Sequence, residues 1–393
     1  MDHSQASTTV SVTPLSHYFD HNATSPLRES GRLALAGGLD ESWCNPSSPH
    51  SEGVRCHALL EDARERFAAI FGGAAERLSF TSGATEGNNA VMAFFHAKTD
   101  SRGKAAVSAV EHPSVLESAK TRFGQNLEQL AVDENGVLCL DALSSFLSEG
   151  KAILISVMAA NNETGVLQPW SEAQALCREF GVPFHCDATQ WLGRMPAEGL
   201  DACDLLTGSF HKLGGPKGIG FLRTSCEDSV RLLYGGHQEG GLRAGTENVP
   251  SILGSLASLE EAIREITDSS NRDLFEKRVA ELIPGIQFLG AEANRLPLVS
   301  SFVLPKFDNL RWINRMDRLG FAVSTGSACA TGRGGPSHVL AAMGHSPEEA
   351  RRFLRVSGGW SNATDDWIAL ADAFGVAYEE LDNDEGESQV ISL

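Results

Sequence analysis

The feature that most constrains the fold is a series of short apolar runs between residues 77 and 224, each followed by a polar cluster. KAILISVMAA (151–160) and VPFHCDA (182–188) are almost continuously apolar, whereas ATEGNNAVMAFFHAK (84–98) has the apolar spacing of a helix. Strands without polar alternation are buried on both faces, and helical connections between them favour parallel pairing. The sequence therefore predicts a doubly wound α/β fold with a mostly parallel sheet.

The pattern changes after about residue 262. The segment 257–283, ASLEEAIREITDSSNRDLFEKRVAELI, predicts one long bridging helix, and LVSSFVLPKF (298–307) predicts a strand of a smaller α+β domain. A chain of 393 residues is long enough for two domains. We expect an N-terminal segment (1–21) that packs with the small domain, a large domain (22–262), and a small domain (263–393) with a largely helical C-terminal part.

Composition excludes some classes of partner. The net charge of −19, from 51 acidic and 32 basic residues, argues against broad binding to nucleic acids or anionic membranes. No run approaches the ~20 apolar residues of a membrane span, and the N-terminus lacks the pattern of a secretory signal. The eight cysteines form no CxxC, so neither a disulfide framework nor a metal site is expected. These features predict a cytoplasmic, reduced protein.

The segment GSFHKLGGPKG (208–218) places Lys212 at the end of an apolar strand, among glycines that let a ligand approach closely. A partly desolvated lysine has a lowered pKa and can form a Schiff base. Ser209 and His211, beside it, can donate hydrogen bonds to an anion. A lone lysine is usually a surface residue, but these neighbours favour a reactive amine.

Asp187, in HCDATQW (185–191), ends another apolar run. Its carboxylate can cap the following helix, or it can keep a pyridine nitrogen protonated so that the ring accepts electrons. Gln190 follows three residues later, where it can bond a ring hydroxyl oxygen. Asn162, in ANNETGV (160–166), is a further donor for such a ring.

TSGATEGNN (81–89) is a glycine turn that opens a helix, which suits one phosphate rather than a dinucleotide. His112, in VEHPSV (110–115), is at another strand end, where it can stack on a planar ring and carry protons. A lone histidine is more often structural. A phosphate site, a stacking ring, a carboxylate and a lysine together indicate pyridoxal 5′-phosphate (PLP).

Cys329 lies in STGSACATGRGGPSHVL (324–340), among small and flexible residues that pack poorly. Structural cysteines are normally buried among large apolar residues. This cysteine is therefore predicted to be a thiol that moves.

With these motifs the chain resembles the NifS/IscS-type cysteine desulfurases, of the class V aminotransferase group with PLP fold type I. The resemblance extends over nearly the whole chain and rests on YFDHNATSP (18–26), NPSSPHSEG (45–53), TSGATEGNN, EHPSVL, NNETGV, DATQ, SFHKLGGPKGIGFL (209–222), RAGTENVP (243–250), STGSACATG and LRVSGG (354–359). It implies a large domain with a seven-stranded, mostly parallel sheet and a smaller α+β domain that carries the catalytic cysteine.

The resemblance also implies a role for each site residue. Lys212 is similar to the Schiff-base lysine, and Cys329 to the nucleophile. His112 is similar to the stacking histidine and is the candidate acceptor for the thiol proton. The remaining implied roles are contacts to the pyridine nitrogen (Asp187), the ring oxygen (Gln190), the cofactor and substrate (Asn162), the phosphate (Ala84, Thr85, Ser209, His211), the phosphate of a neighbouring subunit in a homodimer (Thr246) and the substrate carboxylate (Arg355).

The implied reaction converts L-cysteine to L-alanine and leaves the sulfur on Cys329 as a persulfide. A protein acceptor then takes it for iron–sulfur assembly, thiolation or DNA phosphorothioation. Many relatives carry a second arginine shortly after Arg355, where this chain has Gly359 or Trp360. The alternatives are a selenocysteine lyase, another fold type I aminotransferase or lyase that does not use Cys329, and a cofactor-free binding protein.

Overall fold

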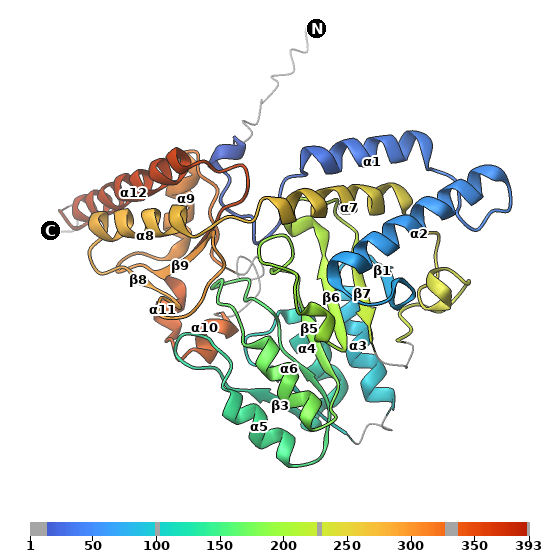
Figure 1. Ribbon diagram of the computed structural model, residues 1–393. Helices are drawn as coiled ribbons and strands as arrows, with labels where there is room; N and C mark the ends of the chain where they lie inside the picture. The colour runs from blue at the N-terminus through green and yellow to red at the C-terminus, as the bar shows by residue number, and fades with distance from the viewer. Residues whose placement is uncertain (1–13, 99–102, 226–229, 327–336, 391–393) are drawn as a thin grey trace, which may run out of the picture.

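The computed structural model describes residues 14–98, 103–225, 230–326 and 337–390. These residues form a large body on a seven-stranded sheet and a smaller body on a three-stranded sheet (Figure 1). The strands of the large sheet, in spatial order, are β1 (Leu78–Thr81), β7 (Gly220–Thr224), β6 (Leu205–Ser209), β5 (Phe184–Asp187), β4 (Ala152–Ser156), β2 (Lys104–Ser108) and β3 (Leu127–Leu130). Within this sheet β7 alone runs opposite to the other six strands. The predicted mostly parallel sheet is therefore confirmed.

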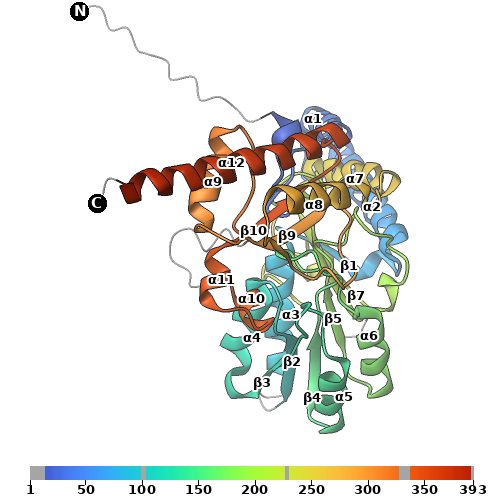
Figure 2. The same ribbon diagram turned by 90° about the vertical axis from the view of Figure 1, so that its left-hand side faces the viewer.

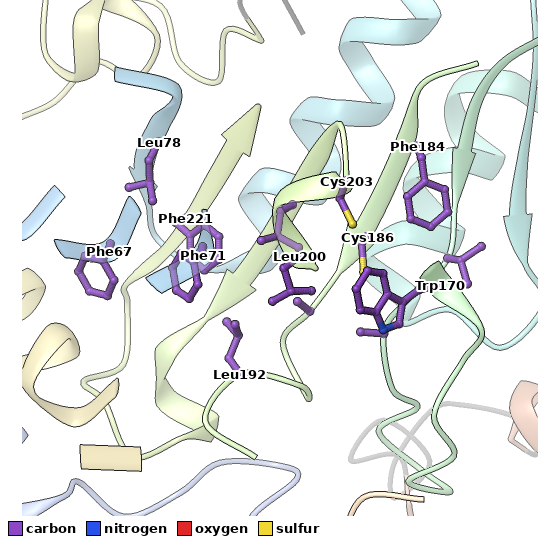
Figure 3. Close-up of a cluster of buried hydrophobic side chains, with 14 of the residues drawn as sticks. Phe67, Phe71, Leu78, Trp170, Phe184, Cys186, Leu192, Leu200, Cys203 and Phe221 are labelled. Carbon is purple, nitrogen blue, oxygen red and sulfur yellow. The ribbon is translucent and has the colours of Figure 1, made fainter. Parts of the chain in front are cut away.

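Helices cover both faces of this sheet, which explains why its strands are apolar throughout. One face packs against α2 (Ser51–Phe71), α5 (Leu140–Ser148), α6 (Trp170–Glu179) and α7 (Val249–Arg264), and the other against α3 (Ala84–Lys98) and α4 (Pro113–Phe123). Neighbouring residues alternate between the two cores, as Leu206 and Leu205 do on β6. Figure 3 shows the first core, where Phe71 and Phe221 stack with ring centroids 4.5 Å apart.

Helix α1 (Glu29–Glu41) lies along α7 at the outer side of the large body (Figure 1). Short 3-10 turns connect several elements: η1 (Leu15–His17), η2 (Ala75–Arg77), η3 (Gly124–Asn126), η4 (Leu200–Ala202), η5 (Phe210–Lys212) and η6 (Glu239–Gly241).

The smaller body is built on the antiparallel strands β10 (Phe353–Ser357), β9 (Val299–Val303) and β8 (Gln287–Phe288). Its helices are α8 (Ser270–Leu282), α9 (Asn309–Arg318), α10 (His338–Ala342), α11 (Pro347–Arg351) and α12 (Thr364–Val390), as Figure 2 shows. An aromatic core that includes Phe302, Trp312 and Trp367 joins α8, α9 and α12 to this sheet.

The N-terminal segment connects the two bodies. Tyr18 and Asp20 form parallel bridges with Ala322 and Ser357, and Phe19 is completely buried in the core of the smaller body. A few residues later, the backbone N–H of Ser25 donates to the carbonyl of His211 in the large body. The segment therefore passes from one body to the other beside the carboxyl end of β6.

Two predictions about the C-terminal part were wrong. The single helix expected over 257–283 is interrupted between α7 and α8, because the Asp268 carboxylate accepts hydrogen bonds from the backbone N–H and hydroxyl of Ser270. Such local side-chain bonds compete with helix formation. The largely helical end also contains a strand, β10, whose five residues are all buried and therefore show no alternation of polar and apolar positions.

Among the described residues, no helix is both long enough and apolar enough to cross a lipid bilayer.

Two leucines test how much the smaller core contributes to stability. Leu370 on α12 has no exposed surface, whereas Leu310 on α9 is 54% exposed. We expect Leu370→Ala to lower the free energy of unfolding by about 2–5 kcal/mol, because it leaves a cavity. The matched control Leu310→Ala should change that free energy by less than about 0.5 kcal/mol. Urea denaturation followed by circular dichroism measures both, and equal effects would contradict the assigned core.

Candidate active site

A cavity of about 470 Å³ opens at the carboxyl ends of the parallel strands. Segments that follow β1, β2, β4, β5 and β6 supply its walls. Of the residues singled out in the sequence, those that line it are Ala84, Thr85, His112, Asn162, Asp187, Gln190, Ser209, His211 and Lys212. Residues from five separate stretches of the sequence thus meet in one cavity, because parallel strands end at the same edge of the sheet.

Lys212 lies in the turn after β6, and its backbone is held from two sides. The hydroxyl of Ser25 donates to its carbonyl at 2.7 Å, and Arg194 donates to the same oxygen at 3.1 Å. Its amine forms no hydrogen bond or ion pair with the described residues. Burial lowers the pKa of Lys212 to about 8, with Arg355 and Arg194 contributing, although Asp187 opposes the shift. A substantial fraction of this amine is therefore neutral and nucleophilic near neutral pH.

Asp187, at the end of β5, is a buried carboxylate that stays charged. Burial raises its pKa, but hydrogen bonds from Thr189 and Asn88 outweigh burial and hold the pKa below its ordinary value. The backbone N–H of Thr189 donates to Oδ1 at 2.9 Å, and the Asn88 amide donates to Oδ2 at 2.7 Å. A fixed negative charge at the floor of the cavity suits a cationic ring nitrogen.

His112 precedes α4 and caps its N-terminus. Its Nδ1 accepts the backbone N–H of Ser114 at 3.1 Å and lies 2.8 Å from the Ser114 hydroxyl. Burial lowers the pKa of His112 to about 4, and the nearby Lys212 lowers it further. The imidazole is therefore neutral at pH 7, and its ring is fixed by the helix that it caps.

The opposite end of the cavity suits a phosphate. Ser82, Gly83, Ala84 and Thr85 line it where α3 begins, so the free N–H groups of a 15-residue helix point into it. Gly220 permits this arrangement, because a Cβ there would lie 2.5 Å from the Cα of Gly83.

Side chains from β6 lie beside this turn. Ser209 and His211 line the cavity, and His211 Nδ1 lies 3.0 Å from the Thr24 hydroxyl. Burial lowers the pKa of His211 to about 4, so it is a neutral hydrogen-bonding group at pH 7.

Several observations show that the residues present fit PLP. The cavity combines a helix N-terminus, an amine without a partner and a buried carboxylate. In addition, Gln190 Oε1 is buried without a hydrogen-bond partner among the described residues, while its Nε2 donates to the Asn22 carbonyl at 3.1 Å. Buried polar atoms are normally paired, so an unpaired one in a cavity wall indicates a polar ligand.

Two residues predicted for the site, Arg355 and Thr246, are not on the cavity wall of this chain, and a third lies outside the described residues. Arg355 is 2% exposed and lies behind Asn162, where it donates to the Asn162 carbonyl and forms an ion pair with Asp20 at 2.5 Å. Thr246 is exposed and away from the cavity. Cys329 lies outside the described residues.

Gly359 and Trp360, where many relatives carry a second arginine, have structural roles in this chain. A Cβ on Gly359 would lie 2.3 Å from the His21 ring, so only glycine fits there. The guanidinium of Arg28 instead lies over the face of the Trp360 ring, with its Cζ 4.0 Å from the ring centroid. Neither residue reaches the cavity wall.

Sequence reasoning missed two buried residues beneath the cavity. Asn88 has no exposed surface and donates to Asp187. Glu111 is also fully buried, and its Oε1 accepts the Met158 N–H at 2.5 Å. Burial, and then the charge of Asp187, raises the pKa of Glu111 well above its usual value, which favours the neutral form of this carboxyl. Both residues belong to polar clusters already noted, TSGATEGNN and VEHPSV, which is the signal that could have identified them.

Comparison with known proteins agrees with this geometry. The family model described as aminotransferase class-V matches residues 17–369. The cysteine desulfurase IscS of Dictyoglomus turgidum is 36% identical over 374 residues, which cover 93% of this chain and 95% of that protein. The chain belongs to the class-V aminotransferase family.

Two solved structures support this assignment. A NifS-like protein superposes with a TM-score of 0.84 at 28% identity and covers 92% of this chain and 99% of its own. A structure titled SspA in complex with cysteine has a TM-score of 0.75 at 28% identity, and the match covers 88% of this chain and 100% of that one. These relatives confirm the predicted fold and the prediction of a PLP-dependent cysteine desulfurase.

The pKa of Lys212 can be tested in this desulfurase without its cofactor. Only the neutral amine attacks a carbonyl, so the rate of Schiff-base formation with added PLP should rise with pH and reach half its maximum near pH 8. A lysine with an ordinary pKa would reach that point near pH 10.4. Stopped-flow absorbance measures the rate. Lys212→Ala should abolish the signal, whereas Lys217→Ala, in the same cavity wall, should leave its midpoint unchanged.

Proposed function

We propose that this desulfurase releases the sulfur of L-cysteine with Lys212 as the Schiff-base residue and acid–base group, and with Cys329 as the sulfur acceptor. The observation that carries the assignment is the Lys212 amine, buried in a cavity opposite the Asp187 carboxylate and without a partner of its own. The neighbour solved with cysteine supports L-cysteine as the substrate.

The residues of the chain divide the chemical work. PLP, when bound, supplies a ring that withdraws electrons from an attached amino acid. Asp187 holds the proton on the ring nitrogen, and His112 covers one face of the ring. Lys212 takes the Cα proton. Ser209, His211 and the first turn of α3 hold the phosphate, and Gln190 bonds the ring oxygen.

The sulfur transfer requires one thiolate. Cys329 Sγ attacks the sulfur of the bound substrate, an S–S bond forms, and the Cβ–S bond breaks. Cβ keeps the electron pair of the broken bond and takes up a proton, so the carbon skeleton leaves as L-alanine and Cys329 carries a persulfide. Thiolates rather than thiols are the nucleophiles in such steps. The persulfide then passes to a protein acceptor, and iron–sulfur assembly, thiolation and DNA phosphorothioation are the proposed destinations.

Arg355 is proposed to bind the substrate carboxylate from behind Asn162. It is already bound to Asp20 and to the carbonyls of Asn162 and Gly326, but its Nε is buried without a partner among the described residues. That unpaired N–H supports a remaining capacity for an anion.

A reducing, cytoplasmic compartment is also proposed. In the described part of the chain, Cys44, Cys56, Cys139, Cys177, Cys186 and Cys203 are all free thiols. Free thiols persist where the surroundings keep them reduced.

The role of Cys329 separates this function from its alternatives. We expect Cys329→Ser to lower alanine and sulfide formation from L-cysteine by at least ~100-fold, because the nucleophile is lost, while the absorbance of bound PLP is retained. The matched control is Cys139→Ser, a partly exposed thiol outside the cavity, which should leave the rate unchanged. Full activity of the Cys329 variant would instead favour a lyase that does not use this thiol, and comparison with L-selenocysteine would then identify a selenocysteine lyase.

A homodimer with shared sites is proposed for Thr246. The segment around it pairs with exposed apolar residues: Leu233 bridges Arg243, and Tyr234 is 84% exposed. Exposed apolar side chains that gather in this way are typical of protein interfaces. Thr246 is exposed and does not line the cavity of its own chain, which supports a contact with the site of a partner.

Complementation between two impaired variants tests this sharing. Lys212→Ala lacks the reactive amine, and Thr246→Ala lacks the proposed phosphate contact from the neighbouring chain. After subunit exchange, a mixed dimer has one site with both groups, so desulfurase activity at low PLP concentration should rise above that of either variant. Sedimentation velocity reports the dimer. No gain on mixing, in a sample shown to exchange subunits, would place Thr246 outside the partner's site.

A further inference from the structure

A buried hydrogen-bond network connects Asp187 to His112 through one amide, that of Asn88 on α3. Its Nδ2 donates to Asp187 Oδ2 at 2.7 Å and to the Ser114 hydroxyl oxygen at 2.9 Å. Its Oδ1 accepts the hydroxyl proton of Thr207 at 2.6 Å. Both amide hydrogens and the amide oxygen therefore have partners in the protein. Thr207 is also fully buried, so water does not compete for these contacts.

The directions of these bonds follow from the charge of Asp187. A carboxylate only accepts hydrogen bonds, so Asn88 must present its NH₂ group to Asp187 and its oxygen to Thr207. Thr207 has one hydroxyl proton, which it donates to Asn88. The contact of 3.0 Å between Thr207 and His185 Nε2 must then be a donation from His185. This places the His185 proton on Nε2, while Nδ1 accepts from the Ser156 hydroxyl at 2.8 Å.

The second branch fixes His112 in the same way. The Ser114 hydroxyl accepts a bond from Asn88, so its proton is free to be donated to His112 Nδ1. The backbone N–H of Ser114 donates to the same nitrogen. A nitrogen that accepts two donors carries no proton, so neutral His112 has its proton on Nε2. The Nε2–H of His112 takes no part in the network, so it is available to a ligand.

We propose that Asn88 is a positioning residue that fixes where the protons of the active site are. It keeps Asp187 an acceptor for the ring nitrogen of PLP, places the proton of His185 on Nε2 through Thr207, and directs the Ser114 hydroxyl to donate to His112 Nδ1 beside the backbone N–H of Ser114. This inference rests on the proposed function for the roles of Asp187 and His112. It also reverses the expected part of His112, since a ring nitrogen that already carries a proton cannot accept the thiol proton of Cys329.

The other titratable groups around Asp187 leave the directions of the hydrogen bonds in this network unchanged near neutral pH. The titratable neighbours are Glu111, His112, His185, Cys186 and Lys212. Burial raises the pKa of Glu111 and of the Cys186 thiol well above their ordinary values, which favours the neutral form of both. Burial lowers the pKa of His185 to about 4, although Asp187 opposes the shift, so this imidazole is neutral too. In the range from pH 6 to 9, only Lys212 changes its charge.

The tautomers can be observed without the cofactor and without activity. In the cofactor-free protein labelled with ¹⁵N-histidine, long-range ¹H–¹⁵N spectra should show Nε2–H tautomers for His112 and His185, identified with His112→Gln and His185→Gln. Asn88→Ala should give mixed tautomers at His185 and should shift the ¹⁵Nδ1 resonance of His112, which keeps the backbone N–H of Ser114 as a donor but loses the directed hydroxyl. The matched control Asn89→Ala removes the adjacent, exposed amide, which donates only to the Thr85 carbonyl, and should change neither ring. Nδ1–H tautomers in the unaltered protein, or no change in Asn88→Ala, would overturn the proposal.

Two further variants separate the branches and remain informative if Asn88→Ala fails to fold. Ser114→Ala removes the hydroxyl donor but keeps the backbone donor to His112 Nδ1, so it should shift the ¹⁵Nδ1 resonance of His112 alone and leave its Nε2–H tautomer in place. Thr207→Val removes the hydroxyl between Asn88 and His185 and should change the His185 tautomer alone. A change at both rings in either variant would mean that the branches are not independently directed by Asn88.

The pH dependence of PLP affinity gives a second readout. Loss of a hydrogen bond to the charged carboxylate raises the pKa of Asp187, so the acidic limit of PLP binding in Asn88→Ala should move up by about 1–2 pH units. Asn89→Ala and Ser114→Ala should leave the acidic limit of PLP binding at its original pH. Weaker binding at every pH, with an unchanged limit, would make Asn88 merely structural. A protein with these tautomers and limits but no desulfurase activity would contradict the proposed function and leave this inference standing.

Discussion

The active site depends on a negative charge held below the protein surface. Placing the Asp187 carboxylate at the floor of a cavity has a desolvation cost, which the hydrogen bonds from Thr189 and Asn88 offset. Around this charge, burial favours the neutral forms of Glu111 and His112, because it raises the pKa of the carboxyl and lowers that of the imidazole. The remaining charged partner is Lys212, whose amine is poised between its two forms. The same buried surroundings thus set both the acceptor for the ring nitrogen and the reactivity of the amine.

The arrangement of the chain leaves Asp187 only 5% exposed. The sheet and its two layers of helices close the cavity from below, and the N-terminal segment closes it beside β6 through Ser25 and Asn22. Arg194 connects these parts, because it donates to the carbonyls of both His21 and Lys212. The segment that bridges the two bodies therefore also holds the backbone of the reactive lysine.

Much of this was predictable. Continuous apolar runs determined the parallel sheet, since only strands covered on both faces tolerate them. Residues at strand ends, such as Asp187 and His112, were recognisable because parallel strands bring their carboxyl ends to one edge. The break after α7 was not predicted, because it depends on a local bond between Asp268 and Ser270 that competes with an otherwise amphipathic pattern. β10 was missed because its residues are buried on both faces and show no periodicity.

By itself the sequence determined the fold class and the cofactor and identified the candidate reacting residues, because these follow from residue types at recognisable positions along the chain. Only the tertiary structure decided which side chains beneath the cavity act on them. Asn88 meets Thr207 and Ser114 from distant parts of the sequence, and Arg355 meets Asp20 across the two bodies. The physical reason is that the direction of a hydrogen bond, and the protonation of a buried group, depend on neighbours in space rather than along the chain.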